Sequence, residues 1–160
     1  MNSNPVRIFD YLLKDAIIPE LQATCSADAI SELVARAAPY LNLKPQVADA
    51  IQHEILAREK EDHFALGQGF ALPHVKHAAL SRVSIVFGRS KAGIPFSALD
   101  GRPVRVFLLL LSPLPSPPEY PVLFGRLLTM LGNRHARSLI QSAKTRDQIL
   151  PAFADAERGV

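Results

Sequence analysis

The sequence predicts a single α/β domain with a mixed β-sheet and helices layered against it. Stretches with helical periodicity alternate with short apolar stretches rich in β-branched and aromatic residues, which is typical of this class. Turn signals between residues 90 and 103 suggest hairpin connections, so we expect a mixed sheet, not a purely parallel one. The length of 160 residues matches one ordinary domain, and we expect residues 1–160 to form it.

Composition excludes several classes of protein. Hydrophobic residues make up 48% and charged residues 21%, close to globular averages, which excludes a wholly disordered or fibrous chain. The net charge of +3 is too small an excess to indicate a nucleic-acid partner. The single cysteine, Cys25, excludes an internal disulfide framework and argues against a cysteine-rich zinc site.

Membrane and targeting signals are also missing from the sequence. The most apolar stretch, 104–111, is too short for a helix to cross a hydrocarbon core of about 30 Å. Residues 1–5 lack the basic and apolar regions of a signal peptide. One unpaired cysteine suits a reducing compartment. We therefore expect a cytoplasmic protein that is not inserted in a membrane.

The first part of the chain predicts a short helix over 6–14, an edge segment over 16–21 and a longer helix after Ser26. Pro19 cannot donate to a central ladder, which favours an edge position. Ser26 is a suitable N-cap for the longer helix. The apolar stripe of that helix consists of Ile30, Leu33, Val34, Ala37, Ala38 and Leu41.

A second long helix is predicted to begin at Pro45, a residue favoured at the first helical position. We expect it to end near Arg58 or Lys60. Its apolar stripe consists of Val47, Ala48, Ile51, Ile55 and Leu56.

Three strands are predicted after the second helix. Residues 70–72 and 84–88 are short and apolar, and 104–111 is a nearly continuous apolar run that suits a strand covered on both faces. Between the last two strands, 92–95 and Asp100-Gly101 read as turns.

The C-terminal part predicts two helices after a rigid connection. Residues 114–121 hold four prolines and are expected to be non-helical. A helical stripe then runs from Leu123 to Leu131, with Gly132-Asn133 as its C-cap. Thr145 and Gln148 have the spacing of a capping box before the last helix.

Among the five histidines, His74 has the most informative position. It follows a glycine-rich loop, a short strand and Pro73, which stiffens the chain that reaches it. A stiff strand end can hold a reactive imidazole in place, and a neutral imidazole can carry a phosphoryl group as a covalent intermediate. The glycines of Gly67-Gln68-Gly69 would let backbone N–H groups approach an anion. On spacing alone, a plain turn histidine is the alternative.

Other interpretations of the histidines have less support. His74 and His77 could form a metal pair, but Pro73 argues against a helix there and no second ligand motif exists, so we expect no metal. We interpret His53 and His135 as solvated or half-buried side chains without a functional partner, and His63 as a surface residue. Nucleophile-elbow, P-loop and dinucleotide-binding motifs are all absent, and no cofactor is expected.

Four segments taken together resemble the type-2 enzyme IIA family of the bacterial phosphoenolpyruvate-dependent phosphotransferase system. This family includes mannitol/fructose IIA domains and nitrogen-related IIA regulators. The resemblance covers essentially the whole chain. Its segments are Leu56-Ala57-Arg58-Glu59-Lys60, Gly67-Gln68-Gly69-Phe70-Ala71-Leu72-Pro73-His74, Gly88-Arg89-Ser90-Lys91-Ala92-Gly93-Ile94 and Ala98-Leu99-Asp100-Gly101-Arg102-Pro103-Val104.

The resemblance implies a mixed sheet with helices on both faces, and it implies roles for particular residues. His74 matches the histidine that takes a phosphoryl group, and Arg58 matches the arginine that neutralises the phosphoryl charge. A guanidinium suits that role because it offers paired N–H donors to phosphoryl oxygens. Gly67, Gln68 and Gly69 are expected to line the phosphoryl pocket. Many members have a second histidine where this chain has Tyr120, and Phe64-Ala65 replaces a common serine or threonine.

The resemblance implies a phosphocarrier with a phosphohistidine intermediate, not an independent multiple-turnover enzyme. Its expected donor is phospho-HPr or the nitrogen-branch homologue of HPr, and a IIB component or a regulated target protein is a possible further partner. A stand-alone nitrogen-related regulator fits best. The alternatives are a separate sugar-specific IIA subunit and a binding module that controls a partner with weak or no phosphorylation. Tyr120 favours the binding module, since a tyrosine does not become a cation near neutral pH.

Overall fold

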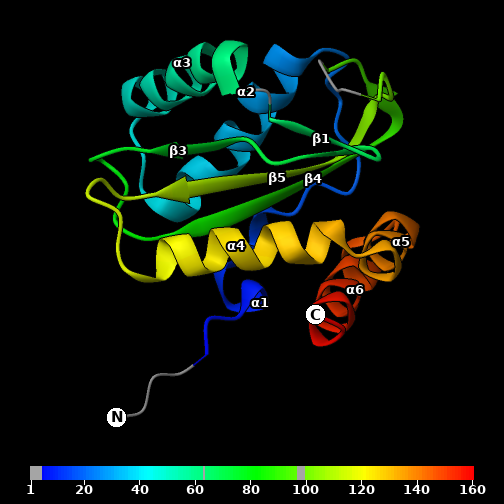
Figure 1. Ribbon diagram of the computed structural model, residues 1–160. Coiled ribbons are helices and arrows are strands. Elements are labelled where there is room, and N and C mark those ends of the chain that lie inside the picture. The colour runs from blue at the N-terminus through cyan, green and yellow to red at the C-terminus, as the bar shows by residue number, and fades with distance from the viewer. Residues whose placement is uncertain (1–4, 63, 97–99) are drawn as a thin grey trace.

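The computed structural model describes residues 5–62, 64–96 and 100–160 (Figure 1). His63, expected at the surface, and the Ala98-Leu99 pair of the family-like segments lie outside these residues. The helices are α1 (Ile8–Tyr11), α2 (Ser26–Ala37), α3 (Pro45–Asp62), α4 (Glu119–Gly132), α5 (Arg134–Ser142) and α6 (Arg146–Arg158), with 3-10 turns η1 (Lys14–Ala16) and η2 (Ala38–Leu41). The strands are β1 (Ala65–Gly67), β2 (Phe70–Ala71), β3 (His74–Lys76), β4 (Ser84–Ile94) and β5 (Val104–Ser112).

The five strands form one mixed sheet with β5 at its centre, which confirms the predicted class. β4 pairs antiparallel with β5 on one side. On the other side, β2 and β3 both pair parallel with β5, and β1 pairs antiparallel with β2. Phe70 is opposite Val106 and His74 is opposite Leu110, so β2 and β3 follow β5 in one continuous register. His74 therefore lies on an edge of the sheet, beyond the reach of β1.

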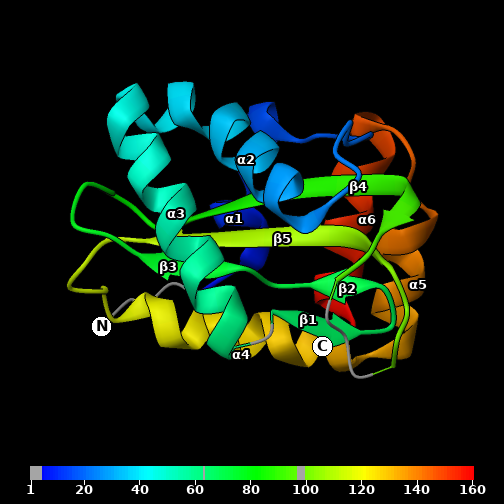
Figure 2. The same ribbon diagram turned by 90° about the horizontal axis from the view of Figure 1, so that it is seen from above.

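Helices cover both faces of this sheet, as the resemblance implied (Figure 2). α2 and α3 pack on one face, and α1, α4, α5 and α6 pack on the other (Figure 1). Alternate residues of β5 serve the two cores, since Leu108 and Leu110 belong to one and Phe107 and Leu109 to the other. This explains the continuous apolar run of β5, because every one of its core residues is covered.

The N-terminal part agrees with the prediction in outline and differs in detail. Ile18 lies along β4, and its N–H donates to the Phe87 carbonyl at 3.0 Å, so the predicted edge segment is confirmed. The predicted helix over 6–14 is shorter, because only α1 and the separate turn η1 form there. Ser26 is the first residue of α2 and not its N-cap; Cys25 occupies the cap position without a side-chain hydrogen bond. α3 begins at Pro45 as predicted and continues to Asp62.

The predicted turn over 92–95 is wrong, because β4 continues through it to Ile94. The ladder is irregular between Arg89, opposite Val106, and Ile94, opposite Val104. The strand absorbs the extra residues as a bulge. Gly93, at φ +83, sits in this bulge, where a side chain would also meet Pro103 at 2.9 Å.

The proline-rich connection is shorter than predicted. α4 already begins at Glu119, so Tyr120 and Pro121 are helical. Pro121 is tolerated there because the first helical turn does not need its N–H group. At the other end, Asn133 is extended and not a left-handed C-cap. Its side-chain oxygen accepts from the Ala136 N–H at 2.9 Å and caps α5, a helix that the sequence interpretation missed.

The predicted cap of the last helix is confirmed. The Thr145 hydroxyl accepts from the Gln148 N–H at 3.3 Å, and the Gln148 side chain accepts from the Lys144 N–H at 2.9 Å. Within the described residues, no helix is long and apolar enough to cross a membrane.

Candidate functional site

His74 begins β3, where the edge of the sheet is flanked by both helical layers. Its half-buried ring makes edge-on contacts with two phenylalanines from opposite sides. Its ring centroid lies 5.0 Å from that of Phe64, which follows α3, and 5.1 Å from that of Phe124 in α4. These contacts hold the imidazole between two apolar walls and leave few orientations open to it.

The hydrogen bonding of His74 fixes its tautomer. The ring Nδ1 lies 2.9 Å from the Leu72 carbonyl oxygen. A carbonyl oxygen only accepts, so Nδ1 carries the proton and donates it. The neutral ring then presents an unprotonated Nε2 with a free lone pair. Pro73 stiffens the connection between acceptor and ring, and its own carbonyl accepts from the Leu110 N–H at 2.8 Å.

Arg58 reaches toward this edge from the last turns of α3. Its guanidinium pairs with Glu54 at 3.7 Å, and both side chains are well exposed. Its positive charge also acts on the hydroxyl group of Tyr120, in α4. Burial raises the pKa of Tyr120 above its usual value of 10.0, and the positive charge of Arg58 opposes that shift. Tyr120 therefore stays a neutral hydroxyl at physiological pH.

Tyr120 is connected to His74 through one intervening ring. It is buried and stacks on Phe124 at 6.2 Å between centroids, and Phe124 contacts the imidazole. The structure thus brings His74, Arg58 and Tyr120 to one edge of the sheet, although they come from β3, α3 and α4.

Lys76 adds a cation that the sequence interpretation did not single out. Its ammonium lies 4.8 Å from the centroid of the Tyr120 ring. Successive side chains of a strand point to opposite faces, so Lys76 and His74 share one face of β3 while Val75 is buried on the other. The alternation of His-Val-Lys after a proline was the available signal.

Gly67, Gln68 and Gly69 do not lie beside His74. They form the β1–β2 turn, with positive φ at all three residues. Phe70 to His74 is extended along β5, so Gly69 lies about 16 Å from His74 along the strand. The Gln68 N–H donates to Asp100 at 2.7 Å, and the Gln68 carbonyl accepts from Gln141 at 2.8 Å. Hydrogen bonds from the backbone N–H groups of Gln68 and Arg102 lower the pKa of Asp100.

The other described histidines lie apart from this group. His77 accepts from the Ala79 N–H at 3.0 Å through its Nδ1, which makes it part of a turn. His53 and His135 are exposed, which agrees with the expectation of a solvated or half-buried side chain. In the part of the chain that the structure describes, no three histidine, cysteine or acidic side chains come together as a metal site.

Comparison with known proteins identifies the family. The family model described as "Phosphoenolpyruvate-dependent sugar phosphotransferase system, EIIA 2" matches residues 10–156. The chain belongs to this family. It is 29% identical over 147 residues to a nitrogen regulatory protein of Bradyrhizobium diazoefficiens, covering 92% of this chain and 94% of that protein. It is 31% identical over 133 residues to a nitrogen regulatory protein of Pseudomonas aeruginosa, covering 82% of each.

Solved structures of this enzyme IIA family have the same fold. The nitrogen regulatory protein IIA-Ntr from Neisseria meningitidis matches with a TM-score of 0.81 at 22% identity, over 91% of this chain and 98% of that one. The complex of mannitol enzyme IIA with phosphorylated enzyme IIB from Escherichia coli contains a chain that matches with a TM-score of 0.71 at 16% identity, over 89% of this chain and 96% of that one. The chain is thus a type-2 enzyme IIA protein in fold and in family.

Proposed function

We propose that this enzyme IIA protein is a phosphocarrier that accepts a phosphoryl group on Nε2 of His74. The observation that carries the proposal is the 2.9 Å contact between Nδ1 and the Leu72 carbonyl, which makes Nε2 the nitrogen with the free lone pair in the neutral ring. The donor is phospho-HPr or its nitrogen-branch homologue. The Nε2 lone pair attacks phosphorus, the donor's N–P bond breaks, and the electron pair returns to the donor imidazole.

The groups around His74 suit the charge of the product. The Nδ1 proton stays on the ring, and the ring gains a positive charge when Nε2 is phosphorylated, which strengthens the hydrogen bond to the Leu72 carbonyl. Arg58 offers N–H donors to the phosphoryl oxygens, and Lys76 adds a second positive charge. Tyr120 is a neutral donor at most. The two phenylalanines restrict water around the bond.

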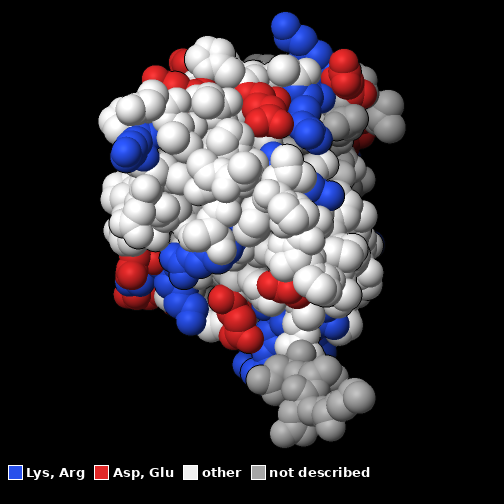
Figure 3. Space-filling view, turned by 90° about the vertical axis from the view of Figure 1, so that its left-hand side faces the viewer, with Lys and Arg blue, Asp and Glu red and all other residues white. Residues whose placement is uncertain are grey.

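The surface around the site suits a protein partner. Figure 3 shows the side of the molecule at which β3 ends and α4 begins (Figure 1). Uncharged residues cover most of this side. Leu114, before α4, is 56% exposed, and Val122, in α4, is 51% exposed. Exposed apolar side chains on α4 and in the connection before it support docking of a carrier protein that delivers the phosphoryl group.

Similarity to two nitrogen regulatory proteins, over 94% and 82% of their lengths, supports a role in regulation, exerted on a target protein, within the nitrogen-related branch. A separate sugar-specific subunit with a IIB partner is the alternative within the same chemistry. The fructose-specific EIIA component of Haloferax volcanii, which is 27% identical over 107 residues and covers 67% of this chain and 70% of that protein, represents that branch among the relatives. A binding module without phosphorylation is the alternative outside it.

Intact mass measurement tests the phosphocarrier proposal. The full chain is incubated with phosphoenolpyruvate, enzyme I and either HPr or its nitrogen-branch homologue. We expect a gain of one phosphoryl group that is lost in acid and stable in base, as a phosphohistidine requires. A reaction without enzyme I is the control. An unchanged mass with both donors, each shown to be phosphorylated itself, contradicts the proposal and favours the binding module.

Replacing Tyr120 by histidine should speed transfer or prolong the life of the phosphorylated form. The new imidazole carries charge below its usual pKa of ~6.5, whereas the raised pKa of Tyr120 keeps its phenol neutral. A phosphoryl group is dianionic near neutrality, so the gain should grow as pH falls, to about tenfold at pH ~6 for one charge-assisted hydrogen bond.

Rates and half-lives of Tyr120→His are measured between pH ~6 and ~8, the range over which a free histidine titrates. Tyr120→Phe is the matched control, because it keeps the ring on Phe124 and beneath Lys76 and loses only the hydroxyl. Equal rates and equal half-lives of the wild-type and histidine forms across this range would show that the position does not contribute to transfer.

A further inference from the structure

A pocket lies at the opposite end of β5 from His74. It has a volume of about 410 Å³. Val106 lines it and pairs with Phe70, whereas Leu110 pairs with His74, so about 13 Å of strand separates the two places. The Gln68–Gly69 turn, which the sequence interpretation assigned to the phosphoryl site, forms one wall of this pocket.

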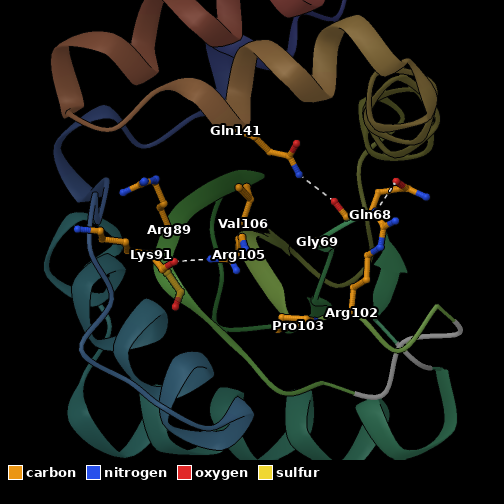
Figure 4. A pocket seen from close by; sticks show the side chains of 10 residues that line it. Gln68, Gly69, Arg89, Lys91, Arg102, Pro103, Arg105, Val106 and Gln141 are labelled. Atoms are coloured by element: carbon orange, nitrogen blue, oxygen red, sulfur yellow. Dashed lines mark hydrogen bonds between the residues drawn. The ribbon is translucent and has the colours of Figure 1, made fainter.

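Four cationic side chains line the pocket and no acidic one does. Arg89 and Lys91 come from β4, Arg102 from the segment before β5, and Arg105 from β5 itself. Figure 4 shows Arg89 and Lys91 on one side and Arg102 on the other, with Arg105 between them. Within the described residues, none of the four belongs to an ion pair. Four positive charges therefore face one cavity, and among the described residues only Arg102 has a carboxylate, that of Asp100, close enough to interact with its charge.

Neutral acceptors hold three of these cations in place. Arg105 donates to the Lys91 carbonyl, and Arg102 donates to the Gln68 side-chain oxygen at 3.2 Å. Arg89 reaches the Pro19 carbonyl at 3.5 Å. A carbonyl or amide oxygen orients a guanidinium without cancelling its charge, and each guanidinium keeps N–H donors for another ligand. The side chains are thus partly ordered in advance, which lowers the cost of binding an anion.

The carboxylate of Asp100 does not line the pocket, although, besides its backbone hydrogen bonds, the nearby positive charge of Arg102 helps to lower its pKa. It accepts from the backbone N–H groups of Gln68 and Arg102 at 2.7 and 3.1 Å. The same turn receives the Gln141 amide from α5 on its carbonyl. Asp100 and Gln141 therefore hold the Gln68 turn in position through hydrogen bonds. The cations that line the pocket indicate a ligand with negative charge.

We propose that this pocket binds a small molecule that carries a diphosphate or two phosphate groups. Arginine forks match phosphate oxygens in pairs, and the cations stand on both sides of the cavity, so one phosphate faces only part of them (Figure 4). The volume falls in the range of about 300–1,000 Å³ that small-molecule sites occupy. This site is separate from the proposed phosphorylation site at His74 and would give the protein a second ligand-binding function.

Isothermal titration calorimetry of the full chain with inorganic pyrophosphate and with ADP tests the site at low salt. We expect a Kd between about 10 μM and 1 mM, weakening as salt rises, and weaker binding of inorganic phosphate. Arg105→Gln and Arg102→Gln should each weaken binding about tenfold or more. Arg36→Gln is the matched control: it removes the same charge from an exposed position on α2 and should leave the affinity unchanged.

Two variants distinguish binding at this pocket from the alternatives: Arg58→Ala tests binding at His74, and Arg36→Gln tests a general effect of net charge. Arg58→Ala should bind pyrophosphate normally, and a loss there would move the binding to the His74 site and overturn the proposal. No heat with either probe at about 1 mM, or wild-type affinity in both pocket variants, also overturns it. Equal weakening by Arg36→Gln would reduce the effect to net charge and overturn it too.

A larger polyanion is the remaining competitor for the pocket. Tighter binding of polyglutamate or of a thymidine oligonucleotide than of pyrophosphate would overturn the small-molecule proposal in favour of a macromolecular partner.

Circular dichroism and phosphorylation of His74 should be unchanged in Arg105→Gln and Arg102→Gln, because both residues lie at the far end of β5 from the histidine.

Discussion

His74→Ala should eliminate phosphorylation by phosphoenolpyruvate, enzyme I and HPr, leaving no gain of mass. The variant removes the imidazole that the Leu72 carbonyl holds in the reactive tautomer. A protein without the nucleophile has no covalent route for the phosphoryl group, so the effect is a loss of stoichiometry and not a slower rate. Intact mass after a long incubation measures it directly.

Two further kinds of variant make this result specific. His74→Gln keeps a polar side chain between the two phenylalanines and should be equally inactive, which separates chemistry from packing. His77→Ala and His135→Ala are the matched histidine controls and should gain one phosphoryl group like the wild type. Phosphorylated His74→Ala would mean that another residue is the acceptor, and peptide mass analysis would then identify it.

The stiff approach to His74 was predictable from local features, although His74 begins a further strand, β3, which the sequence interpretation missed. Pro73 stiffens the chain, the strand is short, and the hydrogen-bond acceptor Leu72 is only two residues away. Information of that kind is contained in a few consecutive residues. The central strand β5 was predictable for a similar reason, since a run of apolar residues needs cover on both faces.

Long-range features were harder to predict. Phe124 joins the site only because α4 packs beside β3, which no local pattern specifies. The glycine turn was assigned to the His74 site because the two are close in sequence. In an extended strand, however, each intervening residue adds about 3.3 Å to the distance between them. The intervening residues therefore place the turn at a different pocket. Family resemblance supplied Arg58 and Tyr120, which periodicity alone would have left as a helix end and a connection.

Arg58→Ala should slow phosphorylation of His74 by about 10- to 150-fold, the loss expected for one charge-assisted hydrogen bond to the transferring group. The fold should be preserved. Arg58 is 43% exposed, and its pair with Glu54 spans one helical turn at the surface, which is worth about 0.3–0.5 kcal/mol. Quenched-flow measurement of transfer from phospho-HPr gives the rate, and urea unfolding of the same sample gives the stability.

Arg58→Lys should lose part of the rate, because an ammonium keeps the charge but not the paired donors of a guanidinium. Lys60→Ala is the matched control on α3. It removes one positive charge from an exposed residue two positions on, which faces away from Arg58 around the helix, and it should transfer at the wild-type rate.

The ionisation of Tyr120 gives a readout of Arg58 that does not depend on transfer. The positive charge of Arg58 favours the phenolate and so lowers the pKa of Tyr120, against the larger effect of burial, which raises it. Removing that charge in Arg58→Ala should raise the pKa of Tyr120 further, whereas Arg58→Lys should change it less. Carbon NMR of the tyrosine ring, titrated toward alkaline pH, measures this shift.

A slower transfer together with a raised Tyr120 pKa would place the Arg58 guanidinium at the His74 site. Unchanged transfer in Arg58→Ala would instead leave Arg58 as a helix-end residue that Tyr120 senses only through its charge, and the neutralising role would then fall to Lys76, the other cation at this edge.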